Sequence, residues 1–354
     1  MKIFNQTQLL DDFVAALAAL PETYVLGSAD EVELGNHRLD RVLDVRLKGR
    51  DVRLAIEAKS SGYPRDVQSA LARLLEARSS GGQIVPVVVA PALSAGSREL
   101  LQRMGVGYWD RGGSLYLDGP SVFFWIDRPV PPADTRRIST IYRGRRAQVL
   151  HALLLEPFRE WHVDALAQRS EVAPSTVHQT LTFLEDQLWV EKRGSGPQAV
   201  RLLREPGKLL DAWASEHSLS RYKSHRFHRW AQRPEDLVNT TSATLDSAGI
   251  NHALTLGSGA HIVAPFTTGV SRLTLVTADS PKIDEVMRVN GFGQVEEGET
   301  VLILATRERS PLMFQRHVEG ARIVSDIQLY LDLFAWPQRG KEQAQHLRAQ
   351  RLQF

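Results

Sequence analysis

STVHQTLTFLEDQLWVEKRGSGPQAVRLL, residues 175–203, is the stretch that says most about how this chain folds. Residues 175–187 have apolar side chains at helical spacing and polar side chains between them. The apolar positions are Val177, Leu181 and Leu184. Two strand-like runs follow at 189–193 and 199–203, and the glycine-containing turn 194–197 separates them. The stretch therefore predicts a helix with a polar outer face that leads into a β-hairpin.

Two more helices are expected before this stretch. Residues 145–155 and 162–168 have apolar residues at helical spacing, and residues 170–174 form a turn before the helix at 175–187. Three short helices followed by a β-hairpin are the order of a winged helix-turn-helix. We place this fold at about residues 143–204, so the sequence predicts a module that binds DNA.

The third helix has side chains that suit contact with duplex DNA. Small and polar residues occupy its outer face, where they can approach base edges and phosphates. Cations in the hairpin and at the start of the first helix suit phosphate contact. The candidate DNA-binding residues are Arg143, Arg145, Arg146, Ser175, Thr176, His178, Gln179, Thr182, Lys192 and Arg193. Residues 143–208 contain ten Lys/Arg and eight Asp/Glu, so use of this fold for protein contacts stays open.

Composition narrows the class of protein. The chain has 354 residues, a formal charge of +2 and no cysteine, which excludes disulfides, thiolate metal sites and a cysteine nucleophile. The first twenty residues contain two aspartates within their apolar pattern, unlike a secretory leader. No apolar run reaches the ~18 residues that a membrane span needs. We expect a cytoplasmic protein without a membrane partner.

Two breaks divide the chain. RPVPPAD, residues 128–134, is rich in proline and is expected to be a linker. RYKSHRFHRWAQR, residues 221–233, is basic and aromatic, which suits either phosphate binding or a connector packed through its aromatic side chains. We expect an α/β multidomain protein with domains at 1–130, 135–220 and 221–354.

The first domain has a candidate metal site. Residues 41–48 and 52–59 are expected strands joined by a turn at 49–51, which places Glu57 opposite Val42. Side chains of one parity then share a face of the sheet, and four charged residues do so: Asp40, Asp44, Glu57 and Lys59. Two carboxylates can hold Mg²⁺, and a lysine can polarise a phosphate or position the attacking water.

Residues 1–128 resemble the PD-(D/E)XK nuclease-like fold in the order of helix, strand with Asp44, strand ending in Glu57-Ala58-Lys59, and helix. The resemblance implies that Asp44 and Glu57 are metal ligands for Mg²⁺ and that Lys59 is the catalytic lysine. Gln68 stands where many members carry a further polar site residue. The activity implied is that of a Mg²⁺-dependent endodeoxyribonuclease; an inactive binding scaffold and a solvated strand end stay open.

GINHALTLGSGAH (249–261) and SDIQLYLDLFAWPQRGKEQAQHL (325–347) resemble AbiEi-like antitoxins and transcriptional regulators of type IV toxin–antitoxin systems. GVGYWDRGGSLYL (105–117) is similar to a segment of nuclease-like regions in the same group. The resemblance implies DNA binding, autoregulation and a cognate toxin as partner, and we expect a homodimer.

The C-terminal domain also resembles a degenerate nucleotidyltransferase-like core. Leu256-Gly257-Ser258 supplies the Gly-Ser pair of that fold, but Ser271 and Leu273 occupy positions where its acids alternate. We therefore expect no nucleotidyl transfer. The leading hypothesis is a sequence-specific regulator, followed by a nuclease targeted by the winged helix and an antitoxin that acts through protein contacts.

Overall fold

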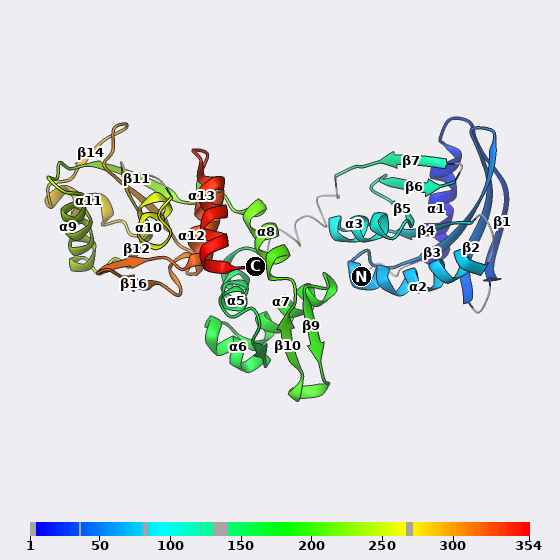
Figure 1. The fold of residues 1–354 in the computed structure, drawn as a ribbon, viewed down its shortest axis with the longest axis horizontal. Helices are drawn as coiled ribbons and strands as arrows, with labels where there is room; N and C mark the ends of the chain where they lie inside the picture. The colour runs from blue at the N-terminus through cyan, green and yellow to red at the C-terminus, as the bar shows by residue number, and fades with distance from the viewer. Residues whose placement is uncertain (1–4, 35–36, 81–83, 121, 130–140, 267–271) are drawn as a thin grey trace. The chain divides into compact units, whose positions relative to one another are not determined.

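The computed structural model describes residues 5–34, 37–80, 84–120, 122–129, 141–266 and 272–354. The chain divides into two compact units, one of residues 1–138 with 182–188 and the other of residues 139–181 with 189–354 (Figure 1). The expected domains at 135–220 and 221–354 thus lie largely in one unit, and their separation stays a prediction. Most of the expected linker at 128–134 lies outside the described residues.

The first unit is a seven-stranded sheet with helices on both faces (Figure 1). Helix α1 (Gln6–Ala18) packs on one face, and α2 (Pro64–Ser80) and α3 (Ala95–Arg103) pack on the other. The strands follow one another in chain order: β1 (Thr23–Leu34), β2 (His37–Leu47), β3 (Arg50–Ala58), β4 (Ile84–Ala90), β5 (Gly107–Asp110), β6 (Leu115–Gly119) and β7 (Val122–Ile126). Strand β3 is parallel to β4, and β4 to β5.

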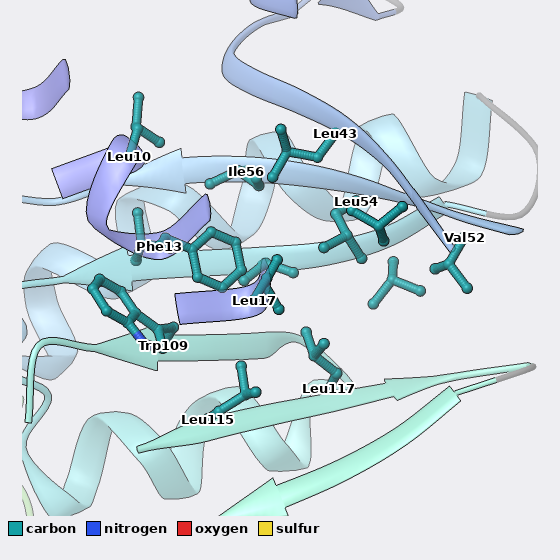
Figure 2. Packing of buried hydrophobic residues seen from close by; sticks show 14 of the residues in the cluster. Leu10, Phe13, Leu17, Leu43, Val52, Leu54, Ile56, Trp109, Leu115 and Leu117 are labelled. Atoms are coloured by element: carbon teal, nitrogen blue, oxygen red, sulfur yellow. The ribbon is translucent and has the colours of Figure 1, made fainter. Parts of the chain in front are cut away.

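The core of this unit explains its sequence pattern. Every residue of β4 (IVPVVVA) is buried, because helices cover both faces of the central sheet. On the α1 side, Phe13 lies against Trp109 with ring centroids 5.6 Å apart, and Leu10 and Leu17 join the same cluster (Figure 2). The apolar periodicity of α1 therefore reflects its packing on the sheet.

The register of the β2–β3 hairpin differs from the expected one. Leu47 pairs with Arg50, so the loop is Lys48–Gly49, and both residues have positive φ of 47° and 78°. Two-residue loops favour this conformation because its twist matches that of the strands. The expected turn at 49–51 was wrong by one residue, which shifts the pairing by two and keeps the face of each side chain.

The second unit begins with the elements predicted from residues 143–204, except that residues 182–188, which include the end of the third helix, are counted in the first unit. Their order is α5 (Gly144–Leu155), β8 (Glu160–Trp161), α6 (Val163–Ser170), α7 (Pro174–Asp186), β9 (Val190–Arg193) and β10 (Val200–Leu203). The three strands form an antiparallel sheet in the order β8-β10-β9. The bounds of the expected helices and strands agree with these to within two residues.

A second seven-stranded sheet follows helix α8 (Pro206–Glu216). Its strand order is β14-β11-β15-β13-β12-β17-β16. The strands are β11 (Lys223–His228), β12 (His252–Leu254), β13 (Leu273–Ala278), β14 (Gly293–Gln294), β15 (Val301–Thr306), β16 (Arg316–Val318) and β17 (Ala321–Ile323). The helices are α9 (Pro234–Ser247), α10 (Leu256–Val263), α11 (Ile283–Val289), α12 (Asp326–Phe334) and α13 (Gly340–Leu347). None of the helices in the described part of the chain is both long and apolar enough to cross a membrane.

Two expectations for this region change. The basic stretch 221–233 is partly a strand, because β11 pairs with β15, and Tyr222 and Phe227 are buried while Trp230 is 78% exposed. Gly257 and Ser258 lie in helix α10, where the Ser258 hydroxyl accepts a hydrogen bond from the Thr274 amide. Of the two positions that replace acids, Ser271 lies outside the described residues and Leu273 is buried.

A buried histidine joins α5 to the turn that begins at Ser310 and to the N-terminal cap of α12. The Nδ1 of His151 lies 3.1 Å from the carbonyl oxygen of Ser310, and Nε2 lies against the hydroxyl of Ser325. Burial lowers the pKa of His151 to about 3, so the ring is neutral at pH 7. A neutral ring that donates from Nδ1 and accepts at Nε2 satisfies both contacts.

Candidate functional site

The first candidate site is a charged cluster at the end of β3. The side chain of Glu57 is fully buried on the face covered by α2. Its Oε2 lies 3.5 Å from Nζ of Lys59 and 3.3 Å from Nη1 of Arg73 on α2. The lysine was expected here, whereas the arginine was not, because nothing in the spacing of α2 shows which residue reaches the sheet.

Asp40 completes this cluster. The β2–β3 pairing runs to Arg41 and Ile56, and beyond it the Asp40 carboxylate accepts a 2.7 Å hydrogen bond from the Ala58 amide. Burial raises the pKa of Glu57, the negative charge of Asp40 raises it further, and Arg73 and Lys59 oppose both. A pKa raised by a second negative charge is expected where two carboxylates share a site.

Asp44 does not belong to the cluster, and its expected sharing of an ion with Glu57 was wrong. It pairs with Arg53 across the hairpin, with Oδ1 2.7 Å from Nε. The two-residue shift in register moves the carboxylate by about 7 Å along the strand, which leaves Asp40 level with Glu57. Gln68 is exposed on α2 and contributes no contact to Glu57 among the described residues.

The cluster offers few ligands for a metal ion. No group of three or more His, Asp or Glu side chains that could hold one occurs within the described ranges. Asp40 and Glu57 supply two carboxylates, and Mg²⁺ is commonly held by one or two carboxylates while it keeps several waters. The set therefore fits a hydrated magnesium ion, with Arg73 as a competing positive charge.

The second candidate site is the outer face of α7. Val177, Leu181 and Leu184 are fully buried, which leaves the polar residues between them on the surface. Among the candidates of this helix, four are exposed and Thr176 is half-buried; the exposed ones are Ser175, His178, Gln179 and Thr182. Arg146 of α5 donates a 3.2 Å hydrogen bond to the side-chain oxygen of Gln179. The face is thus polar and joined to α5.

The cations around α7 differ in how free they are. Arg143, Arg145 and Lys192 are exposed. Arg145 and Lys192 form no ion pair with any described residue. Arg193 lies 2.5 Å from Glu160 and 3.1 Å from Glu191, so two carboxylates offset its charge. Lys192 is therefore the better phosphate contact of the β9–β10 hairpin, a distinction that needs the position of β8.

The solved structures that match this chain are similar to less than a third of it. Among solved structures, a repair endonuclease from Pyrococcus abyssi shares 13% identity at a TM-score of 0.24, over 31% of this chain and 48% of that one. A complex of EndoMS with double-stranded DNA shares 15% identity at a TM-score of 0.24, over 30% and 45%. The chain spans about half the length of these structures, and such scores do not establish a common fold.

No curated protein matches the chain. Residues 201–353 match the family described as "Transcriptional regulator, AbiEi antitoxin, Type IV TA system". The match begins in β10 and extends through the second seven-stranded sheet and helices α8–α13. The C-terminal part of the chain is therefore similar to the regulators of type IV toxin–antitoxin systems.

Proposed function

We propose that this protein is a sequence-specific DNA-binding regulator of the antitoxin type, and that α5–α7 with β8–β10 act as a winged helix-turn-helix. The observation that carries the proposal is the exposed polar face of α7 above a fully buried apolar face. The order of three helices and a three-stranded antiparallel sheet supports it. The similarity of residues 201–353 to AbiEi regulators supports the regulatory role.

In this proposal α7 enters the major groove. Gln179 and His178 contact base edges, which an amide can read through paired donor and acceptor atoms. Ser175 lies at the start of the helix, where its backbone amide and the helix dipole favour a phosphate, and Thr176, whose amide donates to the Ala173 carbonyl oxygen, offers its hydroxyl. Lys192 contacts the phosphate backbone from the hairpin. A cognate toxin and a second copy of the chain are further proposed partners.

The test is the substitution Gln179→Ala in the full chain. We expect binding to the specific site to weaken by about 1–3 kcal/mol, because one base-edge contact is lost. Fluorescence anisotropy with the native promoter and with a scrambled duplex measures both affinities, and binding to the scrambled duplex should stay unchanged.

The matched control is Gln345→Ala, since Gln345 is an exposed glutamine on α13 outside the proposed module. This variant should bind both duplexes as the wild type does. An equal loss on both duplexes for Gln179→Ala would show that α7 does not read bases.

A second candidate function is Mg²⁺-dependent DNA cleavage in the first unit, which the position of Asp40 beside Glu57 and Lys59 favours. Asp40 and Glu57 would hold the ion, which supplies Lewis-acid polarisation of a phosphate when bound. Lys59 would orient a water molecule or stabilise the negative charge on the phosphate.

Cleavage is tested with supercoiled DNA in Mg²⁺ and in EDTA. If the site is active, Lys59→Ala abolishes nicking and keeps promoter binding, because Lys59 lies in the first compact unit and α7 begins in the second. Lys48→Ala, in the hairpin loop, and Asp44→Asn, outside the cluster, should both keep cleavage. Intact plasmid after incubation of the wild type with Mg²⁺ and with Mn²⁺ would exclude the nuclease.

A further inference from the structure

A cavity of about 410 Å³ lies in the second unit, beside the start of α5. Its wall is formed by Tyr142 ahead of α5, Trp213 on α8, residues around β11 and β15, and Gln328 on α12. This volume is within the range of sites that hold small organic molecules. The cavity thus joins the three-helix module to the second sheet.

Tyr142 makes the cavity unusual. Its side chain is only 2% exposed, yet its hydroxyl has no hydrogen-bond partner among the described residues. A buried hydroxyl without a partner costs free energy, so such groups are normally satisfied by protein, water or a ligand. The ring of Tyr142 stacks with that of Trp213, with centroids 6.5 Å apart and planes at 25°. The wall therefore combines aromatic surface with an unused hydrogen-bonding group.

The charges on the wall favour an anion. Arg221 and Lys223 line the cavity and form no ion pair with a described carboxylate, whereas Arg307 is paired with Asp279 at 2.8 Å. Burial lowers the pKa of Arg221 and the charge of Arg143 lowers it further, whereas the carboxylates of Glu308 and Glu216 raise it. A phosphate would add a charge-assisted hydrogen bond to Arg221, whose guanidinium already donates to the Glu216 carbonyl oxygen.

The remaining polar groups are suited to a sugar and a base. Glu308 lines the cavity, and within the described residues its carboxylate accepts one hydrogen bond, of 3.4 Å, from the Gly144 amide. A carboxylate in this position can accept hydrogen bonds from ribose hydroxyls. Gln328 and Tyr222 are fixed at another wall because both bond to the buried carboxylate of Asp332.

We propose that this cavity binds a nucleoside monophosphate. Arg221 and Lys223 hold the phosphate, Glu308 accepts from the ribose hydroxyls, and the base lies against the aromatic wall with a hydrogen bond to the Tyr142 hydroxyl. The ligand bridges the residues ahead of α5 and the second sheet. The proposal goes beyond DNA binding and does not depend on it.

Isothermal titration calorimetry of the full chain without DNA tests the proposal, with AMP, GMP, CMP and UMP as probes. We expect at least one of them to bind with one site per chain. The corresponding nucleoside and inorganic phosphate should each bind at least about ten-fold more weakly, since each lacks one set of contacts.

Two variants assign the contacts. Arg221→Gln should weaken binding of the monophosphate at least about ten-fold and leave binding of the nucleoside unchanged, because only the phosphate contact is charge-assisted. Tyr142→Phe keeps the stacked ring and should weaken both by about three-fold or more. Arg288→Gln is the matched control, because Arg288 is exposed on α11 outside the cavity.

Failure of all four monophosphates to bind would overturn the proposal. The proposal would also be overturned if Arg288→Gln lost as much affinity as Arg221→Gln. It would be overturned too if Arg221→Gln weakened binding of the nucleoside and of the nucleotide equally. The melting temperature of each variant, measured beside the titration, separates misfolding from loss of a contact, and a folded Tyr142→Phe variant of unchanged affinity would overturn the assignment of the base.

Discussion

Glu57 in the first compact unit and Asp332 in the second are both buried carboxylates, and they are held in different ways. Glu57 in the first unit lies beside Lys59 and Arg73, whose side chains are 15% and 37% exposed. Asp332 in the second unit is also fully buried, but it accepts hydrogen bonds from four side chains, three of them on other parts of the fold and one on its own helix α12. The donors are His217, Tyr222, Thr255 and Gln328.

The difference suggests that Glu57 is suited to binding a ligand and that Asp332 is suited to holding the fold together. Long cationic side chains at an exposed edge can move, so a metal ion or a phosphate can replace or join them at Glu57. The donors to Asp332 are short or buried side chains, and Thr255 lies 2.6 Å from Oδ2 and Gln328 2.8 Å from Oδ1. A carboxylate held in this way fixes the elements around it. We therefore expect substitutions at Asp332 to affect folding and substitutions at Glu57 to affect activity.

Asp332→Ala should have the largest effect. Removal of the carboxylate leaves several buried donors without an acceptor, which should lower the free energy of unfolding by about 3 kcal/mol or more. Urea denaturation followed by tryptophan fluorescence measures this loss. Asp236→Ala removes a carboxylate whose side chain is 42% exposed and which pairs with Arg233, so it should change little. Equal stability of the two variants would remove the distinction between the two carboxylates.

The pH dependence of the second unit should be the next largest effect. The folded-state pKa of His151, about 3, lies below the ordinary value of 6.5, so the unfolded chain takes up more protons between these values. The free energy of unfolding therefore falls as the pH drops below 6.5, by about 2 kcal/mol at pH 5. His252, whose pKa burial also lowers, acts in the same direction.

Urea denaturation at pH 7.5 and pH 5.0 gives this difference for the wild type and for His151→Gln. The variant should lose less stability between the two pH values, whatever its stability at pH 7.5. His317→Gln is the control, because His317 is exposed. An unchanged difference in His151→Gln would show that His151 is not the group that titrates.

Glu57→Gln should have the smallest effect, of opposite sign. The pKa of Glu57 is raised above its ordinary value of 4.5, so the folded chain loses stability as rising pH ionises this group. At pH 7.5 the neutral variant should be as stable as the wild type or more stable by up to about 1 kcal/mol. Thermal denaturation against Glu99→Gln, an exposed position on α3, measures it. A clear loss would mean that the ion pairs with Lys59 and Arg73 outweigh the cost of burial.

Elements with strong periodicity were predictable from the sequence. The polar helix at 175–187 and the buried run IVPVVVA both follow from side-chain pattern, which reports which face meets the core. Strand β1 was not predicted, because TYVLGSADEVEL has a central glycine and no regular alternation. Its side chains include Tyr24 at 64% exposure, and pairing with β2 along its length holds it in the sheet. An edge strand of this kind is fixed by its neighbour.

The sequence predicted the residue types at the two candidate sites better than it predicted which residues contact one another there. Glu57 and Lys59 were identified from one strand, whereas the choice between Asp40 and Asp44 depended on which two residues form the turn. Lys48 has a positive φ that is uncommon for a residue other than glycine, so the sequence favoured a loop one residue later. The pairing of Arg193 with Glu160 joins residues 33 positions apart, which local pattern does not report.

The hydrogen bond between His151 and Ser325 has a practical consequence for dissecting the protein. Ser325 also caps helix α12 by accepting from the Gln328 amide, so one hydroxyl serves a helix of the C-terminal sheet and the first helix of the three-helix module. A fragment that ended at residue 220 would expose the buried side of α5 to water. It would also expose the ring of His151, which is buried and neutral in the whole chain. The three-helix module is therefore not suited to transfer into another protein as it stands. A designer would first need to redesign the surface of α5 that contacts Ser310 and Ser325.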